Sequence, residues 1–219
     1  MSQEPTWERI YAAGQQLNRF PYSEAVSYFM RRWPHGVPAD FTVLDIGCGS
    51  GVHANLFADC GASVVAFDYS ASAIQSARQT YPNPNITFET ASFPEFDPNG
   101  RRFDMAFDRL STTNSSRSET RNFYQRLRHA LKPGAHLFWQ GFDMENTGRD
   151  FGTYIPEKEH WDHFTGGVFE PLGQTVFYSE DDLDRIFDGY EVEGKRIISD
   201  QNLQTGYRHS FWMLELRAP

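Results

Sequence analysis

The stretch "DIGCGSGVHA", residues 45–54, decides the fold. It follows the β-branched and apolar run of residues 41–44 and leads into the helix-like segment 50–61, which ends at Gly61. Glycines at 47, 49 and 51 let the chain turn tightly and let a ligand approach the backbone. The helix N-terminus behind them favours an anionic group. The stretch therefore predicts a strand, a ligand-binding turn and a helix of an α/β fold.

The glycine spacing differs from two common phosphate motifs. A P-loop needs GxxxxGK[ST], and no Lys follows Gly51. A dinucleotide fingerprint needs GxGxxG, and Val52 stands where its third glycine would be. A triphosphate is therefore disfavoured, while a phosphate, a carboxylate or a polarised ribose could each occupy the turn.

Two acidic residues further restrict the possible ligands. Asp68 ends the next buried strand, about 20 residues after Gly47, where an acid accepts hydrogen bonds from ribose hydroxyls. Asp45, just before the glycines, disfavours a pyrophosphate and suits an ammonium group. A ribose, a cation and a carboxylate together describe S-adenosylmethionine (SAM).

Strands and helices alternate from residue 41 to about 141, which predicts a doubly wound, mostly parallel sheet with right-handed crossovers. Two helices over 6–14 and 23–33 form an expected N-terminal helical cap, residues 1–40. Two terminal strands, over 190–199 and 207–217, are expected to pair antiparallel. No repeat or linker divides the chain, so we expect a single domain, 1–219. The expected central strands cover 41–47, 63–70, 85–91, 103–110 and 135–142; the helices between and after them cover 50–61, 70–81, 117–134 and 179–189.

Residues 143–178 have no clear period and are rich in Gly, His and aromatic residues. Loops of this length tend to be lids or binding segments, so we expect a lid or acceptor-binding loop. It contains "HWDHF", with His160 and His163 as candidate general bases, because imidazole titrates near neutral pH. Packing within an aromatic loop is the alternative role. No third ligand stands at a diagnostic spacing, so no metal site is expected.

Composition excludes several classes of function. The formal net charge is −9, which argues against nucleic acid or an anionic membrane as partner. No apolar run approaches the ~18 residues of a membrane span, and two cysteines are too few for a disulfide framework. We expect a cytoplasmic protein with a small-molecule substrate, and the oligomeric state stays open.

Successive motifs resemble those of the class I SAM-dependent methyltransferases, small-molecule type. They are "VLDIGCGSG", "VVAFDYS", "ITFETASF", "FDMAFDRL" and "LKPGAHLFW", in that order. The resemblance covers roughly residues 41–141. It implies a Rossmann-like sheet of seven strands with the last one antiparallel, and SAM as the cofactor. A weaker resemblance, over "WERIYAAGQQLNRFPY", is to methyltransferases of bacterial surface-polysaccharide clusters.

The resemblance also implies a set of cofactor contacts. Gly47, Gly49 and Gly51 would line the cofactor, Asp45 would lie near its amino group, and Asp68 would hold the ribose. Many relatives bind the adenine amine with an acid after the third strand, where this chain has Thr90 and Ser92. The remaining expected cofactor contacts are Tyr11, Arg19, His53, Tyr69, Ala91, Ser92, Phe93 and Asp108.

The resulting hypothesis is an enzyme that moves a methyl group to a small polar acceptor, such as a hydroxyl of a sugar or another metabolite. Two alternatives stay open. The sequence "DR" after the fourth expected strand is similar to that of thiol- or metalloid-detoxifying methyltransferases, which would not need His160 or His163. A non-catalytic SAM-binding protein would bind SAM without turnover.

Overall fold

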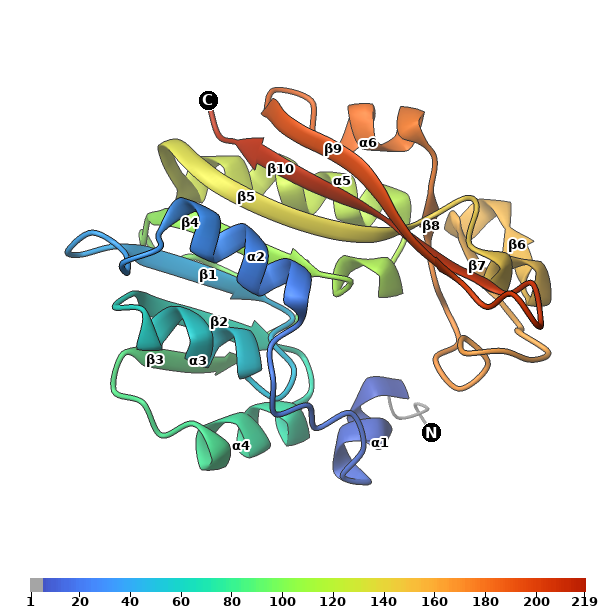
Figure 1. Ribbon diagram of the computed structural model, residues 1–219, viewed down its shortest axis with the longest axis horizontal. Helices are drawn as coiled ribbons and strands as arrows, with labels where there is room; N and C mark the ends of the chain where they lie inside the picture. The colour runs from blue at the N-terminus through green and yellow to red at the C-terminus, as the bar shows by residue number, and fades with distance from the viewer. Residues whose placement is uncertain (1–5) are drawn as a thin grey trace. The chain divides into compact units, whose positions relative to one another are not determined.

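The computed structural model describes residues 6–219, and its contacts divide the chain into two compact units. The first unit ends at Phe107, and the second runs from Asp108 to Pro219. Each unit is described by itself below, with element labels as in Figure 1.

The first unit builds a parallel sheet from alternating strands and helices. Strand β2 pairs in parallel with β1 on one side and with β3 on the other, and the strand order is β3-β2-β1-β4. The elements are α1 (Thr6–Ala12), α2 (Ser23–Arg32), β1 (Thr42–Ile46), α3 (Val52–Asp59), β2 (Ser63–Asp68), α4 (Ala71–Thr80), β3 (Ile86–Thr90) and β4 (Phe103–Arg109), the last of which crosses the boundary between the units.

Local chemistry explains where these elements begin and how they pack. The Ser70 side chain accepts a hydrogen bond from the Ala73 amide (3.0 Å) and so caps α4 at its first turn. Helix α2 buries Phe29 against Phe57 of α3, and Phe57 in turn packs on Phe107 of β4, with ring centroids 4.9 and 5.1 Å apart. This aromatic stack fixes the helices on the sheet.

The second unit centres on three long strands. Strand β10 pairs antiparallel with both β5 and β9, and the short β8 pairs in parallel with β5. Both main helices of the unit begin with a capping box, Ser116 with Glu119 and Ser179 with Asp182. The elements are η1 (Thr112–Asn114), α5 (Arg117–Leu127), η2 (Arg128–Ala130), β5 (Leu131–Asp143), η3 (Thr147–Phe151), β6 (Thr153–Ile155), η4 (Pro156–Lys158), β7 (His160–Asp162), β8 (Phe177–Tyr178), α6 (Glu180–Ile186), β9 (Glu191–Gln201) and β10 (Arg208–Arg217).

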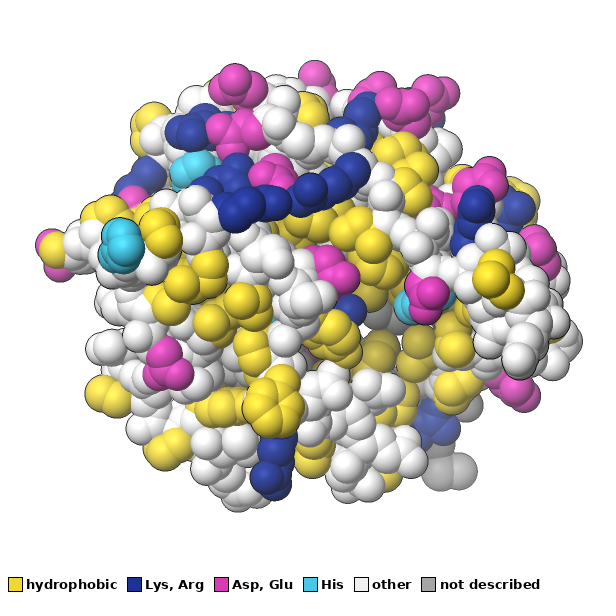
Figure 2. All heavy atoms as spheres, in the orientation of Figure 1, with side chains coloured by type: hydrophobic (Ala, Val, Ile, Leu, Met, Phe, Trp, Pro, Cys, Tyr) yellow, Lys and Arg dark blue, Asp and Glu magenta, His cyan; other side chains and the backbone are white. Residues whose placement is uncertain are grey.

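The two faces of the β5–β10 pair differ. In Figure 1, α5 and α6 lie behind these strands, and Trp139 of β5 packs on that side against Phe187, with ring centroids 5.2 Å apart. On the face seen in Figure 2, Lys and Arg side chains form a row over β9 and β10 with acidic side chains among them. Two ion pairs contribute to it, Arg196–Glu215 and Arg217–Glu193, each at 2.7 Å.

The predicted fold class is confirmed: α/β, with a mostly parallel sheet and an antiparallel strand, β10. Within residues 6–219 the sheet has eight strands rather than the expected seven, because the short β8 also pairs with β5. Two boundaries differ from expectation. Helix α5 ends at Leu127, and β5 begins at Leu131 rather than at residue 135. The prediction of a helix over 117–134 is wrong for its last residues, Lys-Pro-Gly at 132–134, which lie at the start of the strand because η2 has already ended the helix.

Residues 143–178 contain more regular structure than the sequence indicated. Strands β6 and β7 form an antiparallel hairpin, and β8 joins the edge of β5. Trp161, Phe164, Phe169 and Phe177 of the segment form a hydrophobic cluster with Phe142 of β5. The aromatic residues of this segment therefore pack on the end of β5.

Between Thr6 and Pro219, no helix combines the length and the apolar character needed to cross a bilayer. Within the same residues, no group of three or more His, Cys, Asp or Glu side chains is arranged to hold a metal ion.

Candidate active site

The glycine turn between β1 and α3 adopts the conformation that its sequence requires. Gly47, Gly49 and Gly51 have φ angles of 61°, 53° and 83°, in the left-handed region that favours glycine. A Cβ on Gly51 would lie 2.9 Å from the Phe88 ring, so this glycine allows α3 to pack closely. A Cβ on Gly49 would overlap the phenol oxygen of Tyr11. The absence of a Cβ on Gly49 therefore lets the Tyr11 hydroxyl lie directly against the turn.

Asp68, the last residue of β2, ties this turn to the next helix. Its carboxylate accepts hydrogen bonds from the Gly49 amide (3.0 Å) and from the Ser70 amide (2.9 Å), one on each oxygen. Burial raises the pKa of Asp68, and these two backbone amides oppose the rise. Each carboxylate oxygen can accept a further hydrogen bond. Asp68 thus has acceptor capacity left for a ligand, and its ribose role stays a prediction.

Tyr11, on the N-terminal helix α1, lies over the same turn. Burial, with Asp68 adding to it, raises the pKa of the Tyr11 phenol well above its usual value, so the hydroxyl is neutral and can donate a hydrogen bond. Tyr69, predicted as a cofactor contact, receives a hydrogen bond from the Trp7 amide at 3.1 Å. Tyr11 thus connects α1 to the glycine turn and Tyr69 connects α1 to the end of β2, and contact of either with the cofactor stays a prediction.

Glu8 anchors α1 on the N-terminus of α4. Its carboxylate accepts hydrogen bonds from the hydroxyls of Ser70 (2.6 Å) and Ser72 (2.5 Å), and these bonds lower its pKa. Sequence reasoning missed this residue, because a Glu on a short surface helix carries no signal of what it will contact. We call Gly49, Asp68, Tyr11 and Glu8 the cradle.

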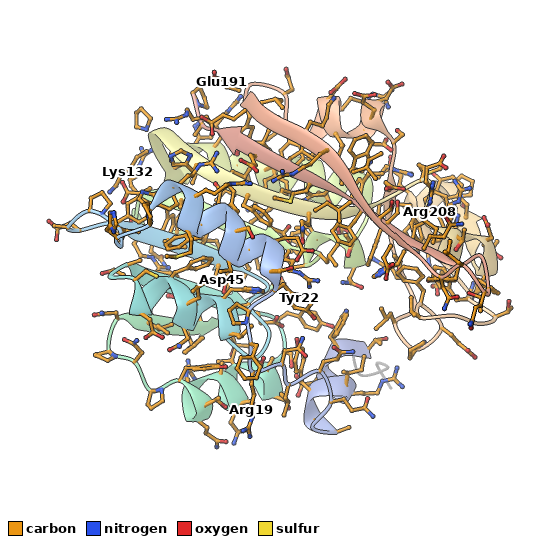
Figure 3. The ribbon with its side chains drawn as sticks, viewed as in Figure 1. Arg19, Tyr22, Asp45, Lys132, Glu191 and Arg208 are labelled. Carbon is orange, nitrogen blue, oxygen red and sulfur yellow. The ribbon has the colours of Figure 1, made fainter. Side chains whose placement is uncertain are left out.

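Asp45 and Arg19, two further residues predicted to contact the cofactor, lie apart from each other. Asp45 is buried at the end of β1, and Figure 3 shows it well apart from Arg19. Arg19 is exposed, and its carbonyl accepts a hydrogen bond from Tyr81, the C-cap of α4 (3.4 Å). The cradle lies at the other end of that helix, so the geometry gives Arg19 no support, and its role stays a prediction.

His53 is buried among aromatic side chains. Its Nε2 accepts a long hydrogen bond from the Tyr22 amide (3.4 Å), and its ring lies 4.9 Å from that of Phe107. These contacts give the imidazole a packing role, and cofactor contact stays a prediction.

Ala91, Ser92 and Phe93, the expected adenine-flanking residues, follow β3 and are half-buried. The Ala91 amide donates to the Asp68 carbonyl (3.0 Å), which joins this stretch to the strand of the cradle. The Ser92 hydroxyl donates to Glu95 (2.8 Å). Its lone pairs can still accept a hydrogen bond, so Ser92 can take the place of the acid that many relatives have.

Asp108 begins the second unit and is fully buried. Its carboxylate accepts hydrogen bonds from the Ser111 amide and hydroxyl (2.9 and 2.5 Å), from Thr112 (2.6 Å) and from Tyr124 (2.6 Å). Burial nevertheless raises its pKa. The carboxylate thus holds the loop after β4 in shape, and direct contact with a cofactor stays a prediction.

The two candidate bases have different environments. His160 is buried in β7, and burial lowers its pKa, so the imidazole is neutral at pH 7 and can accept a proton. His163 is exposed, with a φ of 54°, and its amide donates to the Asp162 side chain (2.7 Å).

Arg117 fixes the segment that carries these histidines. Its guanidinium donates to the Tyr154 hydroxyl (3.0 Å) and the Phe177 carbonyl (2.7 Å), pairs with Asp182 (3.0 Å) and lies over the Trp161 ring. Sequence reasoning missed this role of Arg117, because its partners Tyr154 and Phe177 lie some 40 to 60 residues further along the chain.

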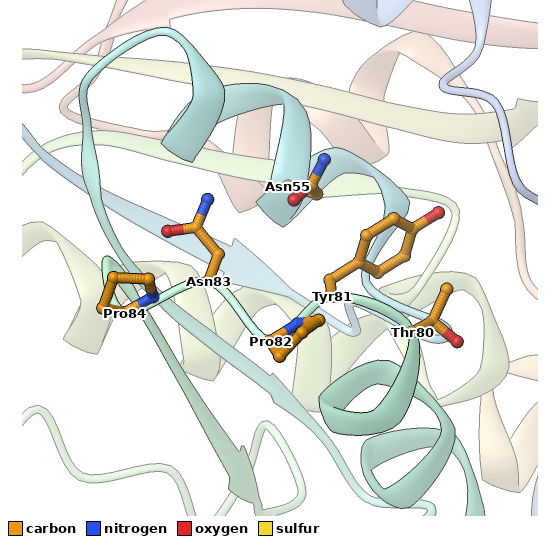
Figure 4. Close-up of a pocket in the computed structure, with 6 residues that line it drawn as sticks. All are labelled: Asn55, Thr80, Tyr81, Pro82, Asn83 and Pro84. Atoms are coloured by element: carbon orange, nitrogen blue, oxygen red, sulfur yellow. The ribbon is translucent and has the colours of Figure 1, made fainter.

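A shallow pocket of about 370 Å³ lies at the C-terminal end of α4 (Figure 4). The residues that line it are Asn55, Thr80, Tyr81, Pro82, Asn83 and Pro84. It has no carboxylate, imidazole or thiol, and it lies at the opposite end of α4 from the cradle. We therefore do not regard it as the reactive site.

Comparison with known proteins gives one family match and several solved structures of similar fold. Residues 43–134 match the family model described as "Methyltransferase domain". No curated protein matches the sequence. Among solved structures, the chain is similar to a SAM-dependent methyltransferase from Methanosarcina mazei, with 19% identity, coverage of 90% of this chain and 98% of that one, and a TM-score of 0.68.

Two further similar structures contain ligands. The N-methyltransferase NodS from Bradyrhizobium japonicum, in complex with S-adenosyl-L-homocysteine (SAH), is 16% identical over 98% of this chain and 97% of that one, with a TM-score of 0.68. The 1,6-didemethyltoxoflavin-N1-methyltransferase from Burkholderia thailandensis, with 1,6-didemethyltoxoflavin and SAH bound, is 15% identical over 96% and 84%, with a TM-score of 0.67.

Residues 43–134 thus form a methyltransferase domain, and the chain shares the fold of solved SAM-dependent methyltransferases. A methyltransferase domain implies an enzyme with S-adenosylmethionine as its cofactor. The cradle fits that cofactor, because the Asp68 carboxylate can accept further hydrogen bonds and the glycine turn leads into a helix N-terminus.

Proposed function

We propose that this enzyme transfers the methyl group of SAM to a hydroxyl group of a small polar metabolite, such as a sugar, in the cytoplasm. The observation that carries the cofactor half of the proposal is the cradle, in which Asp68 is held by the Gly49 and Ser70 amides beneath Tyr11. The acceptor half rests on His160, whose imidazole is neutral and can accept a proton. The net charge of −9 supports a small molecule rather than a nucleic acid as the acceptor. The chain would act as a single domain, with residues 143–178 as its lid or acceptor-binding loop.

Bound SAM supplies an activated methyl group. Asp68 would hold its ribose, Asp45 would face its ammonium group, and Tyr11 would donate to its carboxylate. These contacts would fix the direction of the methyl group, and most of the acceleration would come from that positioning. A hydroxyl acceptor must also lose its proton, and His160 or His163 would accept it.

The cofactor half of the proposal is tested by calorimetry with SAM and SAH. We expect dissociation constants in the micromolar range or tighter. Absence of heat and of competition at millimolar ligand would contradict it.

The acceptor half is tested with methyl-labelled SAM and a cell extract, followed by mass spectrometry of the labelled products. His160→Ala or His163→Ala should then lower kcat by roughly 10²–10⁴-fold without changing SAM affinity. His129→Ala, an exposed histidine at the end of α5, is the control. If both variants keep full turnover, neither histidine is the base, and a thiol or metalloid acceptor becomes the better hypothesis.

A further inference from the structure

Gln140, in the middle of β5, is a buried amide without a hydrogen bond. The side chain is fully buried, and neither Oε1 nor Nε2 has a partner among residues 6–219. Only its backbone is engaged, through the carbonyl that accepts from the Leu110 amide (3.2 Å). Burying an unpaired amide is costly, and folded proteins rarely keep one without a reason. A ligand that pairs with the amide would supply that reason.

The register of the strands shows what surrounds this amide. Met213 of β10 stands opposite Gln140, and Phe211 stands opposite Phe142, so these four residues share one face of the β5–β10 pair. Trp139 points to the other face, toward α6. Gln140 therefore faces away from α5 and α6, among apolar side chains.

The same face carries an aromatic cluster near the end of β5. The His209 ring lies 5.8 Å from Phe142 and 5.9 Å from Phe211, centroid to centroid. His209 is half-buried, and burial together with the positive charge of Arg109 lowers its pKa, so the ring is neutral. Aromatic walls with a few polar groups are the usual composition of a small-molecule site.

We propose that Gln140 determines acceptor specificity by pairing its amide with the amide-like edge of a planar heteroaromatic acceptor. A primary amide presents one acceptor and two donors, so its complement is a ring with an adjacent N–H and C=O, as in a lactam. The half-buried rings of Phe211 and His209 would stack on the ligand ring. This inference rests on the proposed function. It narrows the acceptor from any small polar metabolite to a planar ring that carries the methylated hydroxyl.

The first test concerns the protein without an acceptor. Gln140→Leu removes an unpaired polar group and keeps the volume, so the Tm should be unchanged or about 2–4 °C higher, and SAH affinity should not change. The control is Gln125→Leu on α5, whose side-chain amide donates to the Asp188 carbonyl (3.1 Å) and whose loss should lower the Tm. If Gln140→Leu lowers the Tm as Gln125→Leu does, the amide is already paired and the proposal is wrong.

The second test uses three probes with the SAH-loaded enzyme. We expect 4-hydroxy-2-quinolone, which has a lactam edge, to bind the parent protein and to bind Gln140→Leu about tenfold more weakly or worse. Binding of 1-naphthol, which lacks that edge, should be the same in both proteins, and methyl glucoside should bind neither. Equal quinolone binding by both proteins, or glucoside binding in preference to quinolone, would overturn the proposal. Failure to bind SAH at all would refute the proposed function instead.

Discussion

Replacing Gly49 with Ala is the sharpest test of the cradle. The residue has a φ of 53°, a conformation that costs an L-residue about 1–2 kcal/mol. The new Cβ would also overlap the Tyr11 phenol oxygen, and relief of such an overlap costs about 1–3 kcal/mol. We therefore expect Gly49→Ala to lower the free energy of unfolding by about 2–5 kcal/mol.

The two contributions can be separated because they depend on different atoms. In a Tyr11→Phe background the oxygen is gone, and the nearest ring atom lies 3.4 Å from the Cβ, an ordinary contact. Gly49→Ala should then cost only the conformational part. Gly100→Ala is the matched control, since Gly100 has a φ of 76° and no atom within 4 Å of its Cβ position.

Urea denaturation of the four proteins of this double-mutant cycle gives the coupling energy. We expect about 1–3 kcal/mol between positions 11 and 49, with Gly100→Ala uncoupled to Tyr11. If Gly49→Ala costs the same in both backgrounds, Tyr11 does not lie over the turn, and the account of α1 as the cover of the cradle is wrong.

Two further predictions concern the carboxylates of the cradle. Asp68→Ala should weaken SAM binding about 10–100-fold in calorimetry, with far-UV circular dichroism unchanged, because charge-assisted hydrogen bonds to the ribose are lost; parent-like affinity would remove the ribose assignment. Burial raises the pKa of Asp68, so on acidification its carboxylate should become protonated at a higher pH than an ordinary Asp side chain. SAM affinity should fall in that pH range, and Asp68→Asn should abolish this pH dependence. Glu8→Gln should loosen α1 and speed tryptic cleavage after Arg9, with cleavage at Arg102 as the internal control. Since the pKa of Glu8 is lowered, its stabilisation should be complete above the usual Glu value and disappear as the pH falls through the lowered pKa, a dependence that Glu8→Gln should lack.

The parts of the fold that sequence could predict are those set by local chemistry. The run before Asp45, the three glycines and the helix-forming segment after them each favour the structure they adopt, independently of distant residues. The start of β5 could not be predicted, because Lys-Pro-Gly also suits a helix stop. Strands β6 and β7 are three residues long, too short to show an alternating pattern.

The residues of the site likewise fall into those that the sequence indicates and those that it does not. Asp68 follows from its distance to the glycines, and its hydrogen bond to Gly49 fits the ribose role. Glu8 and Gln140 carry no sequence signal, because their significance lies in what they contact, or fail to contact, after packing. His209 occupies an ordinary position in a terminal strand, and only the strand register brings it beside Phe142.

Arg117 has a consequence for anyone who recombines this enzyme with its relatives. Its side chain joins the hairpin, through Tyr154, to β8, through Phe177, and to α6, through Asp182. A chimera that exchanges residues 143–178 alone would replace Tyr154 and Phe177 and so remove two of the native partners of Arg117. The natural unit of exchange therefore begins at the first residue of α5 and ends after Asp182, and grafts cut at those points should keep their shape in a foreign scaffold.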